Sequence, residues 1–345
     1  MSAPYDLPTD TSKIKEFEWD DHHDFPRDLV GYGENSFDPK WLGGAKIAVS
    51  FVINYEEVIS PSSSSIHSDI PLGAEHTVLN GDIFNYKYTF YAVGKAIEDN
   101  PAVGICSMKN DHDVASHAYR WIDYANMPRS KKRHILRRRL RLLQRSAGSH
   151  QRAGIMADYE ALVWEVYKEM GVPLLWDSDS YAEDLPYWVD VPVEENEKDP
   201  KGMLMIPYSD DCNDYKFNVP TGFGSPTHFY DHVKNAFDTL YEEGCEGSPK
   251  MMTIALHCRC IGKPGRLMAL KRIVEYIASK ENVWVVTRTQ TAEHFREKFP
   301  YQKRLSRTWC QESGSEQHNE RMTCAQGWAC LRLRREVFIA LKQNA

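Results

Sequence analysis

Hydrophobic positions along the chain fall into short strand-like runs, separated by stretches with helical periodicity. In 227–243 and 264–280, apolar residues recur at steps of three and four, and Pro264 suits the first turn of a helix. Alternating strands and helices are typical of a parallel sheet, open or closed. We therefore predict one α/β domain with a barrel-like core. The expected strands lie near 47–53, 88–93, 173–176, 203–206, 252–256 and 283–286.

The same pattern sets the expected domain boundaries. Residues 1–45 are polar and rich in Pro, Gly and Asp, which predicts an irregular N-terminal arm. We expect the barrel-like domain over 46–300 and an atypical tail with weak periodicity over 301–345. Two further stretches interrupt the alternation of strand-like and helical segments. The serine-rich 58–72 is of low complexity, and 129–152 contains ten Lys or Arg and no acidic residue.

The composition predicts a reduced intracellular enzyme. Of the 345 residues, 42% are hydrophobic and 12% aromatic, which is enough for a sizeable core. No run approaches the roughly 18 apolar residues that span a bilayer, and the N-terminus lacks a secretory signal. We therefore expect a cytoplasmic protein with no membrane partner. The eight cysteines include no CxxC pair, which argues against a disulfide framework or a zinc knuckle.

The charge gives little support to a nucleic-acid partner. The formal net charge is -7, so the chain as a whole has no reason to bind a polyanion. The basic stretch 129–152 leaves a nucleic-acid or nuclear-targeting patch as an alternative. Because this stretch has no interleaved aromatic residues on which bases would stack, we predict no nucleic-acid binding.

Candidate catalytic side chains follow three of the predicted strands. Glu56 and Glu57 come after 47–53, Asp177 comes after 173–176, and His257 follows 252–256. Barrel enzymes keep their chemistry at the carboxyl ends of strands, and carboxylates with a histidine are the parts of an acid–base hydrolase. Each residue also has a plain structural interpretation: a solvated loop carboxylate, a cap of the next segment, or a core histidine. Their repeated position favours the catalytic interpretation.

The histidines His112 and His117 give a weaker signal. A separation of five residues does not place both on one face of a helix, so a helix-borne metal pair is unsupported. The alternative is one hydrogen-bonded core histidine and one surface histidine.

Several segments together resemble a known family. They occur in the order expected for the polysaccharide deacetylase (NodB-homology) superfamily, and they are most similar to its metal-independent allantoinase branch and to fungal relatives often called chitin deacetylases. The likeness covers roughly 22–57, 73–127 and 160–300. It implies a distorted (β/α) barrel of the NodB-homology type. The matching segments are Phe25–Gly33, Phe51–Glu57, His112–His117, Asp177–Tyr181, Leu185–Trp188, Ile206–Tyr208 and Leu256–Arg259.

The resemblance implies that this chain uses no metal. Glu56 and Glu57 stand where the family has paired aspartates, one a base and the other a metal ligand. His117 matches the first histidine of a His-x-x-x-His metal motif, but Trp121 occupies the second position and cannot ligate. Catalytic zinc normally keeps three protein ligands, and two remain here at best. We therefore expect no metal and no cofactor.

The implied reaction is hydrolysis of a non-peptide C–N bond in a cyclic amide. Glu56 or Glu57 would deprotonate the attacking water, and His257 matches the family's general acid, which would protonate the leaving nitrogen. Asp177 matches the acidic residue that orients this histidine.

The remaining site residues are expected to hold the substrate. Arg259 or backbone N–H groups would stabilise the oxyanion. Asn54 and Tyr181 would pair with an amide-rich ring, and His117 and Trp121 would line the site. The expected partner is a small-molecule ureide or an N-acetylated sugar. Related barrels form homo-oligomers, so we expect a homo-oligomer here too.

The chain departs from the family at its third motif. A Gly-Arg-x-Ser-Pro type segment is absent from 148–158, so the arginine that would hold the catalytic acid is missing or displaced. This absence supports the alternative of a non-catalytic barrel. A polysaccharide de-N-acetylase is the other alternative, although Trp121 and the lack of a secretion signal argue against it. The departures coincide with the compositional breaks. We therefore expect the gene, read in other frames across 128–158, to encode the missing segment.

Overall fold

The computed structural model describes residues 32, 36–56, 86–119, 127–147, 153–156, 160–190 and 202–301, all within one compact unit, Met1–Ser306. Most of the expected arm 1–45, the insert 58–72 and the expected tail 301–345, apart from Tyr301, lie outside these residues. Within the described part of the chain, no helix is long and apolar enough to cross a membrane.

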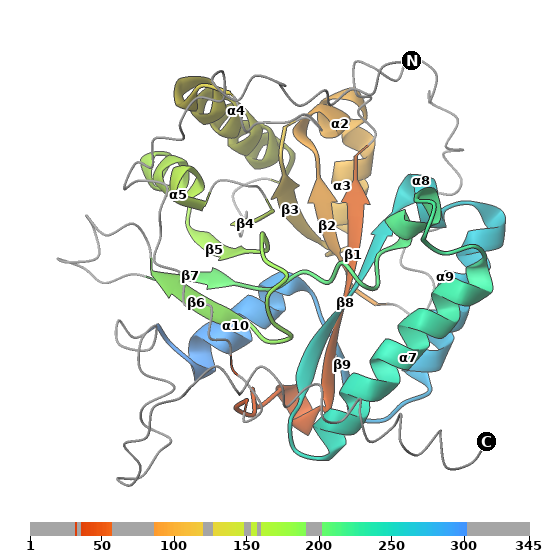
Figure 1. Cartoon of the computed structure of the whole chain (residues 1–345). Coiled ribbons are helices and arrows are strands. Elements are labelled where there is room, and N and C mark those ends of the chain that lie inside the picture. Colours follow the sequence, from red (N-terminus) through yellow and green to blue (C-terminus); the bar gives the residue numbers. More distant parts are fainter. Residues whose placement is uncertain are drawn as a thin grey trace, which may run out of the picture. The chain divides into compact units, whose positions relative to one another are not determined.

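The described strands form one nine-stranded sheet (Figure 1). Its order is β6-β7-β5-β4-β3-β2-β1-β8, and β9 also pairs with β1. All ladders are parallel except β6–β7, which is antiparallel. The strands are β1 (Ile47–Tyr55), β2 (Thr89–Ala92), β3 (Asp113–His117), β4 (Ala153–Met156), β5 (Leu174–Asp177), β6 (Tyr187–Asp190), β7 (Gly202–Met205), β8 (Lys250–His257) and β9 (Val283–Val285).

Helices flank this sheet. In Figure 1, α7 and α9 lie side by side next to β8, whereas α4 and α5 lie beside the part of the sheet formed by β3, β4 and β5. The α-helices are α2 (Gly94–Asp99), α3 (Pro101–Lys109), α4 (Arg129–Ala147), α5 (Glu160–Glu169), α7 (Pro226–Cys245), α8 (Cys258–Ile261), α9 (Pro264–Ala278) and α10 (Arg288–Lys298). Two short 3₁₀ helices, η2 (Leu42–Gly44) and η4 (Asp214–Asn218), complete the set.

The predicted α/β class is confirmed, and all six predicted strands are present with small shifts of their ends. The sequence pattern missed β3, β4 and β6. In β3 the reason is chemical, because the strand begins with a half-buried carboxylate instead of an apolar residue. Asp113 accepts hydrogen bonds from Thr89 Oγ1 at 3.1 Å and from Thr289 Oγ1 at 2.8 Å, which satisfies its charge inside the protein.

No ladder between β6 and β8 is formed by the described residues. Two backbone contacts nevertheless link the outer edge of β8 to the segments that flank β6 and β7. Asn213 forms a parallel bridge with Ala255, and the Met251 N–H donates to the Asp184 carbonyl at 2.9 Å. The first of these contacts matters for the site, because it fixes η4 beside the end of β8.

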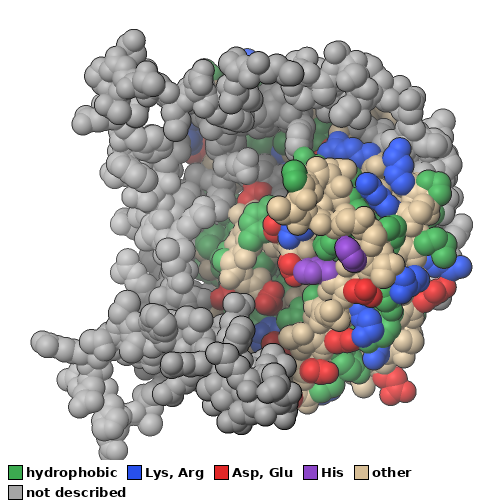
Figure 2. Space-filling view, turned by 45° about the vertical axis from the view of Figure 1, so that its right-hand side comes forward, with side chains coloured by type: hydrophobic (Ala, Val, Ile, Leu, Met, Phe, Trp, Pro, Cys, Tyr) green, Lys and Arg blue, Asp and Glu red, His purple; other side chains and the backbone are tan. Residues whose placement is uncertain are grey.

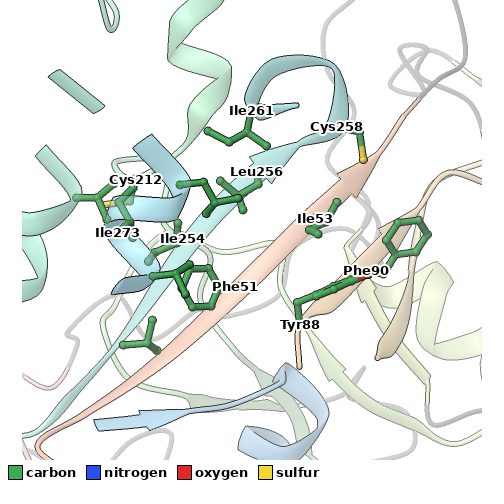
Figure 3. Close-up of a cluster of buried hydrophobic side chains, with 14 of the residues drawn as sticks. Phe51, Ile53, Tyr88, Phe90, Cys212, Ile254, Leu256, Cys258, Ile261 and Ile273 are labelled. Carbon is green, nitrogen blue, oxygen red and sulfur yellow. The ribbon is translucent and has the colours of Figure 1, made fainter. Parts of the chain in front are cut away.

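Strand β1 is the centre of the core. Every residue of β1 is buried, because neighbouring strands pair with both of its edges and side chains pack on both of its faces. Phe51 and Ile53 point into one apolar cluster with Ile254 and Leu256 of β8 (Figure 3). Val52 belongs to a second, separate cluster of buried apolar side chains. Because both faces of β1 are buried, the apolar residues of 47–53 follow one another in the sequence without polar alternation.

Most of the basic stretch 129–152 forms helix α4. Its apolar residues Leu136 and Leu140 are buried in a cluster with α5 and β5. Part of its positive charge is neutralised by glutamates. On the face shown in Figure 2, which is turned toward the α7 and α9 side, basic side chains likewise lie beside acidic ones. The ion pairs join Arg129 and Arg133 to Glu165, Arg133 and Arg137 to Glu169, and Arg138 to Glu98. The stretch thus fits the fold as a packed amphipathic helix.

The packing of α4 can be tested with Leu140→Ala. Because Leu140 is 1% exposed, its truncation is expected to lower the free energy of unfolding by about 2 to 5 kcal/mol in urea denaturation. The neighbouring Arg141 is exposed, so Arg141→Ala is the matched control, with an expected change within about 0.5 kcal/mol. Equal effects of the two substitutions would contradict the packing of α4 described above.

Candidate active site

The pairing of β1 with β8 brings two of the predicted residues together. The register places Asn54 opposite His257, so Glu56 emerges just beyond the end of β1, beside the end of β8. Both side chains are buried, each about 6% exposed. His257 Nε2 lies 3.6 Å from Glu56 Oε2. The ends of β1 and β8 therefore bring a carboxylate and an imidazole face to face.

Two further side chains hold the Glu56 carboxylate. His117, at the end of β3, donates from Nε2 to Oε1 over 2.8 Å. Arg259, from α8, donates from Nη2 to Oε2 over 2.8 Å and from Nη1 to the Glu56 backbone carbonyl over 3.3 Å. The carboxylate is thus fixed by groups from two different elements.

This environment sets the charge of Glu56. Burial alone would raise its pKa. The hydrogen bond from His117 and the electrostatic attraction of His117, His257 and Arg259 outweigh burial and lower the pKa to about 2. Glu56 is therefore ionised throughout the neutral range.

A buried carboxylate that the sequence analysis missed orients His257. Asp214 Oδ1 lies 2.7 Å from His257 Nδ1, and Asp214 Oδ2 accepts the His257 backbone N–H over 3.0 Å. Burial raises the pKa of Asp214, and the hydrogen bonds from His257 oppose that rise. Since Nδ1 donates its proton to Asp214, Nε2 is the ring nitrogen that faces Glu56.

The expected role of Asp177 is wrong in this respect. We expected Asp177 to orient His257, but the carboxylate bonded to the imidazole is Asp214. Asp177 ends β5, which is separated from β8 by four other strands of the sheet. Its Oδ1 accepts the Asp179 backbone N–H over 2.9 Å, so it caps the turn after β5. No strand-end signal for Asp214 was present in the sequence, because Asp214 does not directly follow the predicted strand 203–206.

The residues expected to bind substrate occupy different positions. Asn54 is buried, and its Nδ2 donates to Tyr208 Oη over 2.9 Å and to the Leu256 carbonyl over 3.2 Å. Its amide nitrogen is therefore used within the protein, not toward a ligand as expected. Tyr181 is 61% exposed. Its ring is oriented edge-on to the ring of Tyr208, and the two ring centroids are 6.0 Å apart. Glu57 and Trp121 lie outside the described residues.

Comparisons with known proteins agree with the resemblance in the sequence. No model of a protein family matches the chain. A Schizosaccharomyces pombe protein, assigned by its name to the polysaccharide deacetylases, is 36% identical over 318 residues, which cover 80% of this chain and 98% of that protein. The chain belongs to the polysaccharide deacetylase family. The predicted resemblance is therefore confirmed.

Two solved structures of this family extend the comparison. One is the PuuE allantoinase, and the other is a protein of Pseudomonas aeruginosa PAO1 described as a probable polysaccharide deacetylase. Each has a TM-score of 0.67 and 34% sequence identity, and each match covers 81% of this chain and 100% of the other. The predicted fold is confirmed by these neighbours, which include both an allantoinase and a deacetylase-like protein.

The residues at the family's metal position do not fit a divalent cation. Glu56 and His117 would have to be ligands, and Glu56 Oε1 lies 2.8 Å from His117 Nε2. The second oxygen of Glu56 is bonded to Arg259, whose fixed positive charge opposes a cation at the same carboxylate. Trp121 offers no ligand atom where the family has a second histidine. Two protein ligands are fewer than the three that catalytic zinc normally keeps.

The charge of Glu56 predicts how stability depends on pH. A carboxylate whose pKa falls from 4.5 to about 2 on folding stabilises the protein above its unfolded pKa, and this contribution is lost as the pH falls. Between about pH 6 and about pH 3, the wild type should lose about 2 kcal/mol relative to Glu56→Gln. Urea unfolding of both proteins across this range measures the difference. A difference that does not change with pH would contradict the lowered pKa.

Proposed function

We propose that this chain is a hydrolase that opens a cyclic ureide through attack of water on an amide carbonyl, without a metal. The observation that carries the proposal is the contact chain from Asp214 through His257 to Glu56, at 2.7 Å and 3.6 Å. We call these three residues the relay. The 34% identity with the PuuE allantoinase over its whole length supports a ureide as the substrate class.

In the proposed mechanism, a water at the open side of the relay attacks the carbonyl carbon and passes a proton to Glu56. The pKa of this carboxylate is lowered to about 2, far below that of an imidazole, so the proton moves on to His257 Nε2. Asp214 stabilises the imidazolium through Nδ1. His257 then gives the proton to the ring nitrogen as the C–N bond breaks. The products are a carboxylic acid and an amide nitrogen that carries the proton from water.

Arg259 has two roles in this proposal. It holds the Glu56 carboxylate toward His257, which fixes the geometry of the first proton transfer. Its side chain is one-third exposed, so the guanidinium can also be reached by the oxygen on which negative charge develops. The exposed ring of Tyr181, packed against Tyr208, is a surface for a planar ligand beside the relay.

A second candidate is hydrolysis of an N-acetyl group on a sugar. The relatives in Schizosaccharomyces pombe and Pseudomonas aeruginosa are named for deacetylation, which favours this candidate. The chemistry at the relay would be the same, because an acetamide is also an amide whose nitrogen must be protonated as it leaves. The two candidates differ only in the shape of the group that reaches Glu56.

Turnover separates the candidates. The purified chain is expected to open the allantoin ring at an equal rate with and without EDTA, and His257→Gln should lower kcat at least about hundredfold. Release of acetate from N-acetylglucosamine oligomers, measured in parallel, tests the second candidate. Allantoin opening that EDTA abolishes would contradict the metal-independent mechanism. A His257→Gln enzyme of normal kcat would remove His257 from the proton transfer.

The choice between Asp214 and Asp177 gives a second test. Asp214→Asn cannot stabilise an imidazolium at Nδ1, so it should lower kcat on the order of hundredfold or more and change the pH profile of kcat. Asp177→Asn is the matched control, because Asp177 is as fully buried but lies at the end of β5. Far-UV circular dichroism checks that both variants fold. An equal fall in kcat for both would contradict the assignment of Asp214 to the relay.

A further inference from the structure

A thiol lies next to the two inner residues of the relay. Cys260 Sγ, one ring nitrogen of His257 and a carboxylate oxygen of Asp214 all lie within 4.8 Å of one another, and all three side chains are buried. Nδ1 is the ring nitrogen that faces Asp214, at 2.7 Å from Oδ1. The geometry follows from the chain: α8 begins directly after His257 and carries Cys260 back over the end of β8. Asn218 Nδ2, from η4, donates to Cys260 Sγ over 2.9 Å. The element that carries Asp214 is therefore tied to the thiol as well.

These three groups form the ligand set of a soft divalent cation. A thiolate, an imidazole nitrogen and a carboxylate oxygen are the protein ligands that zinc takes in tetrahedral sites, and the thiolate adds a preference for cadmium and other thiophilic ions. We propose that Asp214, His257 and Cys260 bind a thiophilic divalent cation, and that the bound cation inhibits the hydrolase. The inhibitory part of this inference rests on the proposed function.

The inhibition follows from the protons that binding displaces. The cation takes the lone pair of His257 Nδ1, and the proton at this atom moves to Nε2. The Cys260 thiol gives up one proton to solvent, and the thiolate and the Asp214 carboxylate neutralise the two charges of the cation. His257 Nε2 then carries a proton and can no longer accept one from Glu56. The relay is blocked with every catalytic side chain still present.

Binding also requires a small rearrangement. Nδ1 and Oδ1 are 2.7 Å apart in their hydrogen bond, whereas two ligands of a tetrahedral zinc lie about 3.3 to 3.8 Å apart. The cation must therefore replace the direct bond between His257 and Asp214. This competition makes the site an inhibitory one, because the orienting bond and the cation exclude each other.

Two other positions are less suited to the same ion. Asp211, Cys212 and His232 form a similar cluster, but Asp211 is exposed and Lys216 Nζ lies 4.0 Å from its Oδ1. The family's metal position at Glu56 lacks a thiol and is already bonded to Arg259. The buried cluster beside the relay combines three ligand types, and the positive groups that act on its thiol, Arg259 and Arg266, form no ion pair with Asp214 among the described residues.

Cadmium titration of the full chain tests the inference without relying on turnover. Cadmium–thiolate bonds absorb in the ultraviolet, and other cysteines of the chain also contribute, so the informative quantity is the part of the band that depends on Cys260. Cys260→Ala should lose one equivalent of this band. Cys258→Ala is the matched control, because Cys258 lies on the same short helix but packs in the apolar cluster of Figure 3. It should keep that equivalent, and Cys212→Ala measures the competing cluster.

Turnover of allantoin, or of the N-acetylated oligomer, is measured in the same titration. For each variant, inhibition is compared with its own rate without metal. Wild type and Cys258→Ala should lose activity as the Cys260-dependent band rises, whereas Cys260→Ala should require at least tenfold more cadmium. A band in Cys260→Ala as strong as that of the wild type, or inhibition of Cys260→Ala at the same cadmium concentration, would overturn the inference. If no variant turns over either substrate without metal, the proposed function fails, and the Cys260-dependent band alone decides the cation site.

Discussion

The parallel pairing of β1 with β8 is the constraint on which the site depends. Eight consecutive residue pairs, from Ile47 with Lys250 to Asn54 with His257, hold the two strands in one register. A slip of one residue would turn every side chain of β1 to the opposite face and separate Glu56 from His257. The register is specified because β1 is buried on both faces, so a slip would also disrupt both apolar clusters.

The second requirement is that the buried charge of Glu56 be compensated. An isolated carboxylate inside a protein costs much free energy unless it is paired and hydrogen-bonded. His117 and Arg259 supply both kinds of contact; His117 ends β3, and Arg259 lies on α8, which directly follows β8 on the other side of β1. The same contacts that make burial tolerable aim the carboxylate at His257. Stability and the proposed chemistry therefore depend on one arrangement.

These features explain which parts of the site could be predicted from sequence. Glu56 and His257 follow long apolar runs, and parallel strands bring their carboxyl ends to one edge, so strand-end reasoning found both. Asp214 could not be found in this way, because its position depends on a short 3₁₀ helix and on the bridge between Asn213 and Ala255. Asp177 was misassigned because the order of strands in the sheet is not visible in the order along the chain.

The same limits apply to the fold. Long, continuously buried strands and the amphipathic α7 and α9 were predictable, because one kind of side chain dominates each face. Strand β3 was not, since Asp113 and His117 are polar residues whose partners come from distant parts of the chain. Helix α4 was obscured by its charge, and its partners in α5 and α2 could be identified only in three dimensions.

The missing third motif can now be weighed against the geometry. Its absence suggested that no arginine holds the catalytic acid, which supported a non-catalytic barrel. In the structure an arginine from a different element, Arg259 of α8, donates to the Glu56 carboxylate at 2.8 Å. This arginine lies two residues beyond His257 and holds the proposed base, whereas the proposed acid His257 is held by Asp214. An inactive barrel would have no need to keep a buried carboxylate, an imidazole and an orienting acid in mutual contact, since apolar residues would fill the same space at lower cost.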